Sequence, residues 1–324
     1  IRCMKKYFGY IVMAIMICGL SSCVGKTKNT STSGLATVVC DDSFENIMDQ
    51  EIGVFEYIYP EASIIPYYTN ERAALDSLFE FKTKLVVIPR ELTANEKQYI
   101  KNSGRNVKVN KIAVDAIALI VNPENPIEIL SISEIAEILS GKVTDWNQLS
   151  PNKTGKISVV FDHEGSSVVK YMKDSLLNGG LFGPNVYAQK SNDEVFEAVQ
   201  KLKGAIGIIG VSWINSDMRS AEITNEHRAK ALEKNDTTIA NFDTRVKVLK
   251  VRRDDEIEAR KPYQAYIYDG SYPLFRSMYM VSTAANGSIA HGFYSFVTSF
   301  RGQKIIQMTG ILPATIQPRM VNLN

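Results

Sequence analysis

The sequence is poor in the residues that build metal sites and disulfide frameworks. Its 324 residues include only four cysteines and three histidines. The histidines, His163, His227 and His291, are far apart and share no i,i+4 spacing, so we expect neither a metal site nor a cofactor. Three of the cysteines lie before residue 24, which excludes a disulfide framework in the folded body. Cys40 lies in an apolar run, where a buried and inert thiol is expected.

An excess of charge of one sign is also lacking. The chain has 37 Lys and Arg against 35 Asp and Glu, for a formal net charge of +2, and a body this close to neutral argues against a nucleic-acid partner. Gly165-Ser166-Ser167 lacks the Gly-x-Ser-x-Gly elbow of a hydrolase nucleophile. The glycines at 204, 207 and 210 lie in an apolar run without a following helix cap, which speaks against a dinucleotide loop. We therefore expect a protein without catalytic activity.

Only one apolar run is long, and it lies at the N-terminus. Two lysines precede Tyr7–Leu20, and the small residues Ser21 and Ser22 lead to Cys23 in a pattern that resembles a bacterial lipobox. The run is shorter than the roughly 20 residues that a membrane-spanning helix needs. The pattern predicts a signal peptide over 1–22, lipidation of Cys23 and a polar tether over 23–34. The mature protein would then be held outside a bacterial membrane, in the periplasm or at the cell surface, by lipid alone.

The remainder of the chain alternates short β-rich runs with helical patterns, which favours α/β layers. Its length exceeds what one hydrophobic core usually serves, so two lobes are expected. Two strand–turn–helix units are distinctive. Ala36–Cys40 leads through Asp41-Asp42-Ser43 into a helical pattern, and Ile157–Phe161 leads through Gly165 into a helix that Ser166 or Ser167 would cap. A helix start offers unpaired N–H groups and the positive end of the dipole, which suits a small anion.

Further along, a family resemblance emerges. The stretches DAIALIVNPENP, from Asp115, and LSISEIAEILSGKVTDWNQL, from Leu130, resemble the phosphate-binding solute receptors of ABC importers. The order and spacing of the matching segments carry the resemblance, which runs along nearly all of residues 35–314. The further segments are 161–177, 204–213, 272–280 and 296–314.

The resemblance implies a two-lobed periplasmic-binding-protein type II fold of the α/β class, with two strand crossovers and a ligand cleft between the lobes. Lobe one would comprise 35–113 plus 282–324, and lobe two would comprise 114–281. Residues 215–262 are polar and dense in charge, and we expect them to be an insertion that forms a solvated surface excursion.

The resemblance also implies a scheme for the site. In this family, Ser and Thr hydroxyls, helix N-termini and one Arg bind the oxyanion, and an Asp accepts from protonated phosphate. An Arg is suited to this because its planar fork matches two oxygens at once. Carried onto this chain, the scheme gives as ligand-binding residues Asp42, Ser43, Thr69, Asn70, Arg90, Gly165, Ser166 and Ser167.

Three features depart from the family pattern. Asp162 stands where the cleft Arg generally precedes the Gly-Ser loop, and the acids Asp41 and Asp42 follow the first strand. The loss of a buried Arg opposite a dianion costs several kcal/mol unless another cation replaces it. Arg90 either supplies that cation or forms a salt bridge at the surface or between the lobes.

The hypothesis is an extracytoplasmic, monomeric lipoprotein that captures a small oxyanion, inorganic phosphate foremost, and delivers it to an ABC permease. Two alternatives stay open. One is a receptor for a different small polar ligand, and an amine or cation would suit the added acids. The other is a non-transport lipoprotein on the same fold, acting as a sensor or scaffold, for which residues 215–262 offer a docking surface.

Overall fold

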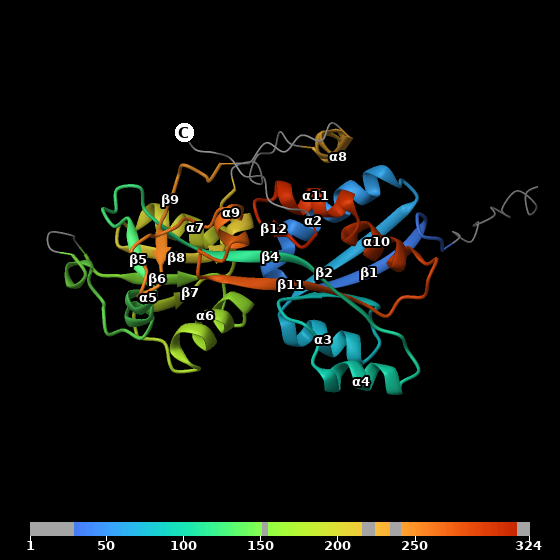
Figure 1. The fold of residues 1–324 in the computed structure, drawn as a ribbon, viewed down its shortest axis with the longest axis horizontal. Helices are drawn as coiled ribbons and strands as arrows, with labels where there is room; N and C mark the ends of the chain where they lie inside the picture. Colours follow the sequence, from blue (N-terminus) through green and yellow to red (C-terminus); the bar gives the residue numbers. More distant parts are fainter. Residues whose placement is uncertain (1–28, 151–154, 216–223, 234–240, 316–324) are drawn as a thin grey trace, which may run out of the picture.

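A computed structural model describes residues 29–150, 155–215, 224–233 and 241–315. The fold is two α/β bodies joined side by side, and two long strands run from one body into the other (Figure 1). One sheet passes through both bodies, with the order β2-β1-β3-β11-β4-β8-β6-β7. The expected α/β class and the two-lobed architecture with two strand crossovers are therefore confirmed. The expected signal peptide (1–22), Cys23 and most of the tether lie outside the described residues.

In the structure, lobe one is built on three parallel strands, with helices on both faces of the sheet. Side chains alternate between these faces, as strand geometry requires. Val38 and Cys40 of β1 join the core under α2, α10 and α11, whereas Val39 joins a smaller core under α3. The elements are β1 (Gly34–Asp41), α2 (Glu45–Ile58), β2 (Ala62–Thr69), α3 (Glu71–Phe79), β3 (Leu85–Ile88), α4 (Ala94–Asn102), α10 (Ile289–Thr298) and α11 (Phe300–Met308).

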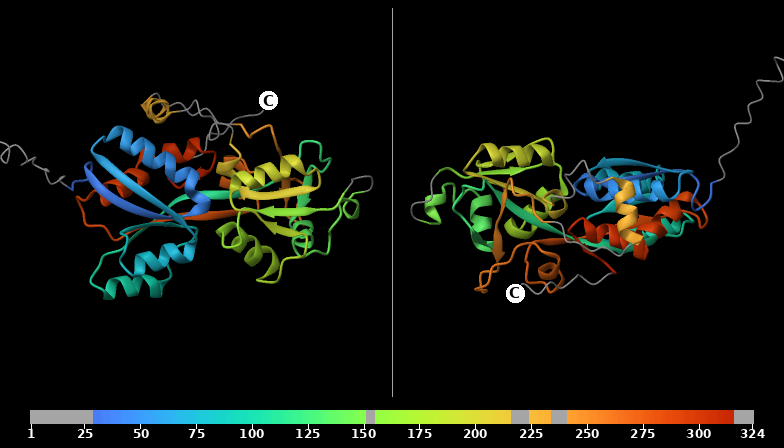
Figure 2. Two further views of the ribbon diagram at one scale, coloured as in Figure 1. Left: turned by 180° about the vertical axis from the view of Figure 1, so that it is seen from behind. Right: turned by 90° about the horizontal axis from the view of Figure 1, so that it is seen from above.

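Lobe two repeats this plan around β8, β6 and β7, which are also parallel. Helices α7 and α9 lie on one side of its strands and α5 and α6 on the other (Figures 1 and 2). Its elements are β5 (Ile129–Ser131), α5 (Ile132–Leu139), β6 (Ser158–Phe161), α6 (Ser167–Leu177), β7 (Val186–Ala188), α7 (Asn192–Lys201), β8 (Ala205–Gly210) and α9 (Gln264–Tyr268).

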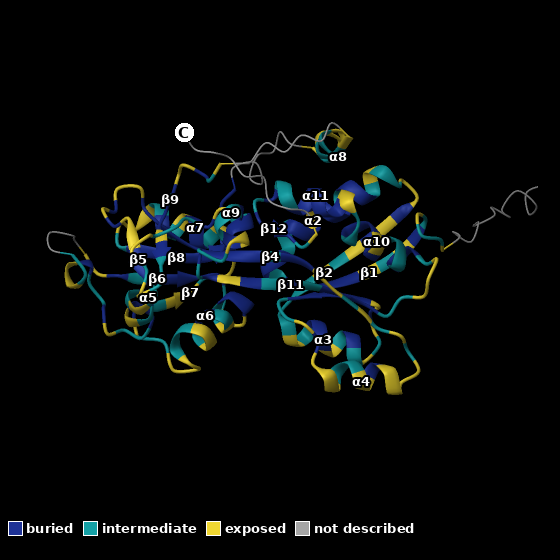
Figure 3. Cartoon of the chain, viewed as in Figure 1, coloured by how far each residue is buried: buried dark blue, intermediate teal, exposed yellow. Residues whose placement is uncertain are grey.

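The two long strands are β4 (Lys108–Val121) and β11 (Phe275–Ser282), which pair antiparallel. β4 pairs with β11 over Lys108–Ala116 and with β8 over Ile117–Val121, so its partner changes within one continuous strand. The short β12 (Leu312–Pro313) also pairs with β4. β4 is almost entirely buried from Ile112 onward (Figure 3). The sequence divides the lobes at 113/114, and the change of partner falls three residues later.

The segment expected as a solvated insertion differs from that prediction where it is described. β9 (Lys247–Val248) pairs with β4, and β10 (Lys250–Arg252) pairs with β5. Val248, Leu249 and Val251 are buried because these strands extend the core of lobe two. The described remainder of the segment is mostly exposed or half-buried, although Asp243 and Val246 are buried.

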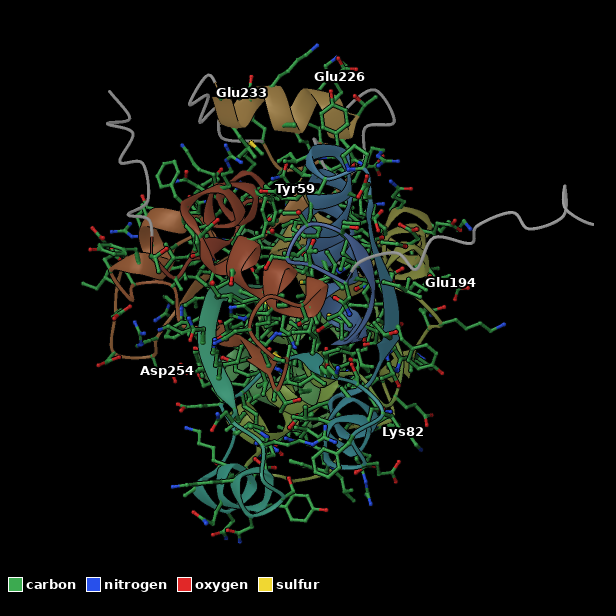
Figure 4. The ribbon with its side chains drawn as sticks, turned by 90° about the vertical axis from the view of Figure 1, so that its right-hand side faces the viewer. Tyr59, Lys82, Glu194, Glu226, Glu233 and Asp254 are labelled. Carbon is green, nitrogen blue, oxygen red and sulfur yellow. The ribbon has the colours of Figure 1, made fainter. Side chains whose placement is uncertain are left out.

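Helix α8 (Asn225–Glu233) belongs to the same segment but packs against α2 and α11 of lobe one. Figure 4 shows α8 above the helices of lobe one, with Glu226 and Glu233 labelled along it. The approach is close because a Cβ added at Gly53 of α2 would lie 2.5 Å from Asn225 Nδ2. A part of the chain that leaves lobe two thus covers lobe one.

Candidate functional site

Five polar side chains form a buried network where the two lobes meet. Each is at most 5% exposed. Asp41 ends β1, and Ser43 lies in the short 3-10 turn η1 (Asp42–Phe44) before α2. Ser167 is the first residue of α6, and the last two members lie on the crossover strands, Asp115 on β4 and Arg276 on β11.

The strand register places the cation. Arg276 of β11 is directly opposite Asp115 of β4, so their side chains project from the same face of the ladder. Arg276 Nη2 and Nε lie 3.1 and 3.3 Å from Asp115 Oδ2. The guanidinium carbon also lies 4.6 Å from the centre of the Phe44 ring. This ion pair and this ring fix the orientation of the guanidinium.

The free edge of the guanidinium faces two hydroxyls. Arg276 Nη2 donates to Ser43 Oγ at 2.8 Å, and Nη1 donates to Ser167 Oγ. The two hydroxyl oxygens are 3.0 Å apart. They therefore occupy the two positions in which a planar fork binds two oxygens of one oxyanion. A small oxyanion can take these positions if the hydroxyls turn and donate to it.

Asp41 completes the network from the other side. Its Oδ1 accepts hydrogen bonds from Ser167 Oγ at 2.7 Å and from Ser43 Oγ, while Oδ2 has no partner among the described residues. Burial raises the pKa of Asp41, and the nearby Arg276 opposes the rise. The pKa of Asp115 is raised by burial in the same way. A buried carboxylate that is more basic than usual is a strong hydrogen-bond acceptor, so Asp41 can receive a proton-bearing group.

The starts of α3 and α6 lie beside the network. Ser166 caps α6, because its hydroxyl accepts from Val169 N at 3.2 Å, and Ser167 is thereby free to face Asp41. Gly165 precedes the cap and lines a cavity of about 340 Å³ beside the network. Asn70 also lines this cavity and caps α3 by accepting from Ala73 N at 3.0 Å.

Of the predicted residues only Ser43 and Ser167 belong to the network, and Arg90 and Thr69 make their contacts elsewhere. Arg90 Nε donates to Glu71 at 2.6 Å, and its terminal nitrogens donate to both oxygens of Glu96 at 2.8 Å. Arg90 lines the cavity, but it forms the salt bridge that the sequence left as one alternative, so it does not replace the cleft Arg. Thr69 ends β2 beside Asp41 in the strand register and is half-buried.

The other two added acids, Asp42 and Asp162, line a second cavity of about 400 Å³. Asp162 is buried, and its Oδ1 accepts from His163 N at 2.9 Å. Asp42 Oδ2 lies 2.8 Å from His163 Nε2, an ion pair between the lobes when the imidazole is protonated. Burial and then the nearby Asp41 raise the pKa of Asp42 to about 6. The acids are thus near the cleft, as the sequence indicates, and a histidine faces one of them.

The sequence reasoning missed Arg276, Asp115 and His163. Asp115 and Arg276 lie inside stretches that carry the family resemblance, but the apolar strand pattern around each of them conceals it. A signal was present, since each is a lone charge within a run of buried strand residues. A buried charge needs a partner.

Among the described residues, no helix has the length and apolar content that a membrane crossing needs. In the same parts of the chain, no group of three or more His, Cys, Asp or Glu side chains is placed to hold a metal ion. Cys40 is buried and free, as expected.

Comparison with known proteins adds relatives along the whole fold. The chain is 24% identical over 312 residues to the phosphate-binding protein PstS of Pseudomonas aeruginosa, covering 88% of this chain and 85% of that protein. It is 23% identical over 295 residues to PstS of Borreliella burgdorferi, covering 88% and 92%.

Solved structures share the fold. An ABC-type phosphate transport receptor from Vibrio cholerae superposes with a TM-score of 0.62 at 20% identity, covering 86% of this chain and 99% of the receptor. A phosphate-binding protein from Stenotrophomonas maltophilia superposes with a TM-score of 0.58 at 15% identity, covering 88% and 92%. Residues 26–301 match the family model of the PBP superfamily domain, and the chain therefore belongs to the PBP superfamily.

Proposed function

We propose that this protein is a substrate-binding receptor that captures inorganic phosphate for an ABC importer. The observation that carries the proposal is the guanidinium of Arg276, held by Asp115 with its free edge toward Ser43 and Ser167. The relatives named as phosphate-binding proteins support the choice of ligand.

Binding exchanges internal hydrogen bonds for bonds to the ligand. Phosphate takes the place of the two hydroxyl oxygens on the Arg276 fork, and Ser43 and Ser167 turn to donate to it. The N-terminus of α6 adds backbone N–H groups and the positive end of its dipole. Asp41 accepts a hydrogen bond from a protonated phosphate oxygen. Sulfate has no such proton at neutral pH, so it would place an oxygen lone pair against the carboxylate and is rejected.

The division of the chain into lobes is part of the proposal. Residues 35–113 plus 282–324 act as lobe one and 114–281 as lobe two, and β4 and β11 serve as the hinge. Asn70, Arg90 and Gly165 line the cavity beside the anion, Ser166 fixes the start of α6, and Thr69 and Asp42 flank the site. Ligand shifts the lobes toward the closed state by its preference for that state.

The setting of the receptor is also proposed. Residues 1–22 act as a signal peptide, Cys23 carries lipid and holds the protein outside a bacterial membrane, and the protein acts as a monomer that meets an ABC permease. It performs no chemistry on its ligand.

The test is calorimetric titration of the purified protein with phosphate at pH 7, with sulfate as the competing anion. We expect a single site that binds phosphate and rejects sulfate. Ser167→Ala should weaken phosphate binding by roughly 10- to 150-fold, since one hydrogen bond to a charged group contributes about 1.5–3 kcal/mol. Ser175→Ala, on the same helix, is the matched control and should bind as the wild type does. Absence of binding at millimolar phosphate would refute the proposal.

A further inference from the structure

A second set of contacts joins the lobes beside the anion network. Asp42 follows β1 in lobe one, and His163 follows β6 in lobe two. His163 Nε2 and Asp42 Oδ2 are 2.8 Å apart, and both side chains are only partly exposed, at 31% and 25%. At this separation the contact is an ion pair when the imidazole is protonated, so its strength depends on the charge of the ring.

The surroundings of His163 are rich in carboxylates. The shared cavity is lined by Asp42, Glu45 and Asp49 from η1 and α2, by Asp162 from the same loop as His163, and by Lys190 and Asp193 at the start of α7. The cavity lies beside Asp41, whose charge acts on Asp42. A proton on the imidazole therefore places one positive charge among more acids than bases.

We infer that His163, through its pair with Asp42, is a positioning residue that holds the lobes closed on the bound anion and makes anion affinity depend on pH. The inference rests on the proposed function. Because Asp42 and His163 come from different lobes, their attraction exists only when the cleft is closed. Any interaction confined to the closed state increases ligand affinity by its own free energy. The proton also offsets the charge of Asp42, which would otherwise repel the anion.

The pair has its full charge in a narrow pH range. Histidine ordinarily changes charge between pH 5 and 8. Asp42, whose pKa is raised to about 6, is ionised only above that pH. The attraction therefore requires a pH at which the Asp42 carboxylate is ionised while an imidazole still carries its proton, and it is lost at pH values above the ordinary histidine range. The ionisation of phosphate itself is the same for every variant, so it cancels in a ratio of dissociation constants.

The experiment compares phosphate affinity of wild type and His163→Gln at pH 6.5 and 8.5. We expect the variant to bind roughly two- to fivefold more weakly than wild type at pH 6.5, which corresponds to the contribution of a partly exposed ion pair. At pH 8.5 it should bind about as well as wild type. His163→Arg keeps the charge at both pH values, so it should bind as wild type does at pH 6.5 and roughly two- to fivefold more tightly than wild type at pH 8.5. His227→Gln on α8 is the matched control and should match the wild type. A constant ratio at the two pH values, or an undiminished His163→Gln effect in an Asp42→Asn background, would overturn the inference.

Lobe closure supplies a readout without ligand. Spin labels at Lys101 of α4 and Glu137 of α5, both exposed and in different lobes, report the separation of the lobes. We expect wild type to shift toward larger separations between pH 6.5 and 8.5 and His163→Gln to show no such shift. If wild type bound no phosphate, the proposed function would fail, and this measurement would still decide the role of His163. A separation independent of pH in wild type would refute it.

Discussion

Removal of Arg276 tests the centre of the site. In Arg276→Ala the anion loses a buried two-pronged cation, while Ser43, Ser167 and Asp41 remain. Truncation of one partner of a buried, hydrogen-bonded charge pair costs about 2–5 kcal/mol, which is roughly a 30- to 5,000-fold loss of affinity. We expect a loss in the upper part of this range, because Arg276 is only 5% exposed. Without its charge, the nearby carboxylates of Asp41 and Asp115 would repel the anion. Titration with phosphate up to millimolar concentration measures the loss.

The same substitution also removes the partner of Asp115, which is fully buried. An uncompensated buried charge destabilises a protein by about 3–5 kcal/mol, so Arg276→Ala is expected to unfold at lower urea concentration. The double variant Arg276→Ala/Asp115→Asn separates the two effects. It should regain much of the stability and none of the affinity. If instead the double variant regained phosphate binding, Arg276 would be a structural cation, and the reasoning about the fork would be refuted.

Three further changes follow from the packing and the charges. Glu51 of α2 is fully buried with both carboxyl oxygens unpartnered among the described residues, and burial raises its pKa. Folding therefore takes up a proton at Glu51, and stability is lost as pH rises through the pKa of the folded state. Glu51→Leu removes this dependence, so it should stabilise the protein by about 1–3 kcal/mol in urea melts at pH 8 and by less at pH 5. An equal gain at both pH values would contradict this. Gly207→Val should destabilise the protein by about 1–3 kcal/mol in the same assay, since an added Cβ would lie 2.8 to 2.9 Å from Val195, Ile120 and Val199; an unchanged midpoint would show that the core yields there. Lys170→Gln breaks the 3.5 Å ion pair with Glu71, but the Lys170 side chain is 61% exposed. The change in phosphate affinity should therefore be less than about fivefold and should shrink as salt is added. A larger loss would place Lys170 in the site.

Local patterns in the sequence predicted individual helices and strands, whereas the two-lobed fold with two crossovers was implied by the family resemblance. Strands such as Leu85–Ile88 are short runs of apolar residues bounded by turn residues, and their bounds agree with β3. Ser166 was recognisable as a cap because a hydroxyl precedes an apolar helical pattern. The apolar patterns over 107–113 and 116–121 each predict a separate strand, but the structure has the single strand β4 there because Val114 and Asp115 continue the pairing with β11.

The centre of the site depends on pairing between distant strands, which local patterns do not encode. Arg276 and Asp115 meet only because β11 returns antiparallel to β4 in one register. The buried strands of the charged segment were missed for a different reason. Val246, Val248 and Val251 alternate with basic residues, and the abundance of charge concealed a strand pattern. From the sequence, His163 was considered only as a metal ligand, and that role was rejected. In the structure its neighbour across the cleft is the carboxylate of Asp42.

The change of partner within β4 has a mechanical consequence. If the lobes open and close as proposed, β4 and β11 must twist while they stay hydrogen-bonded to each other. The paired strands would resist that twist, so the lobes would tend to return to one separation. Asp115 lies next to this point, and Arg276 is opposite Asp115. In the proposed receptor, Arg276 would therefore lie at the hinge, and each twist of the strands would change the angle at which its guanidinium meets Ser43 and Ser167.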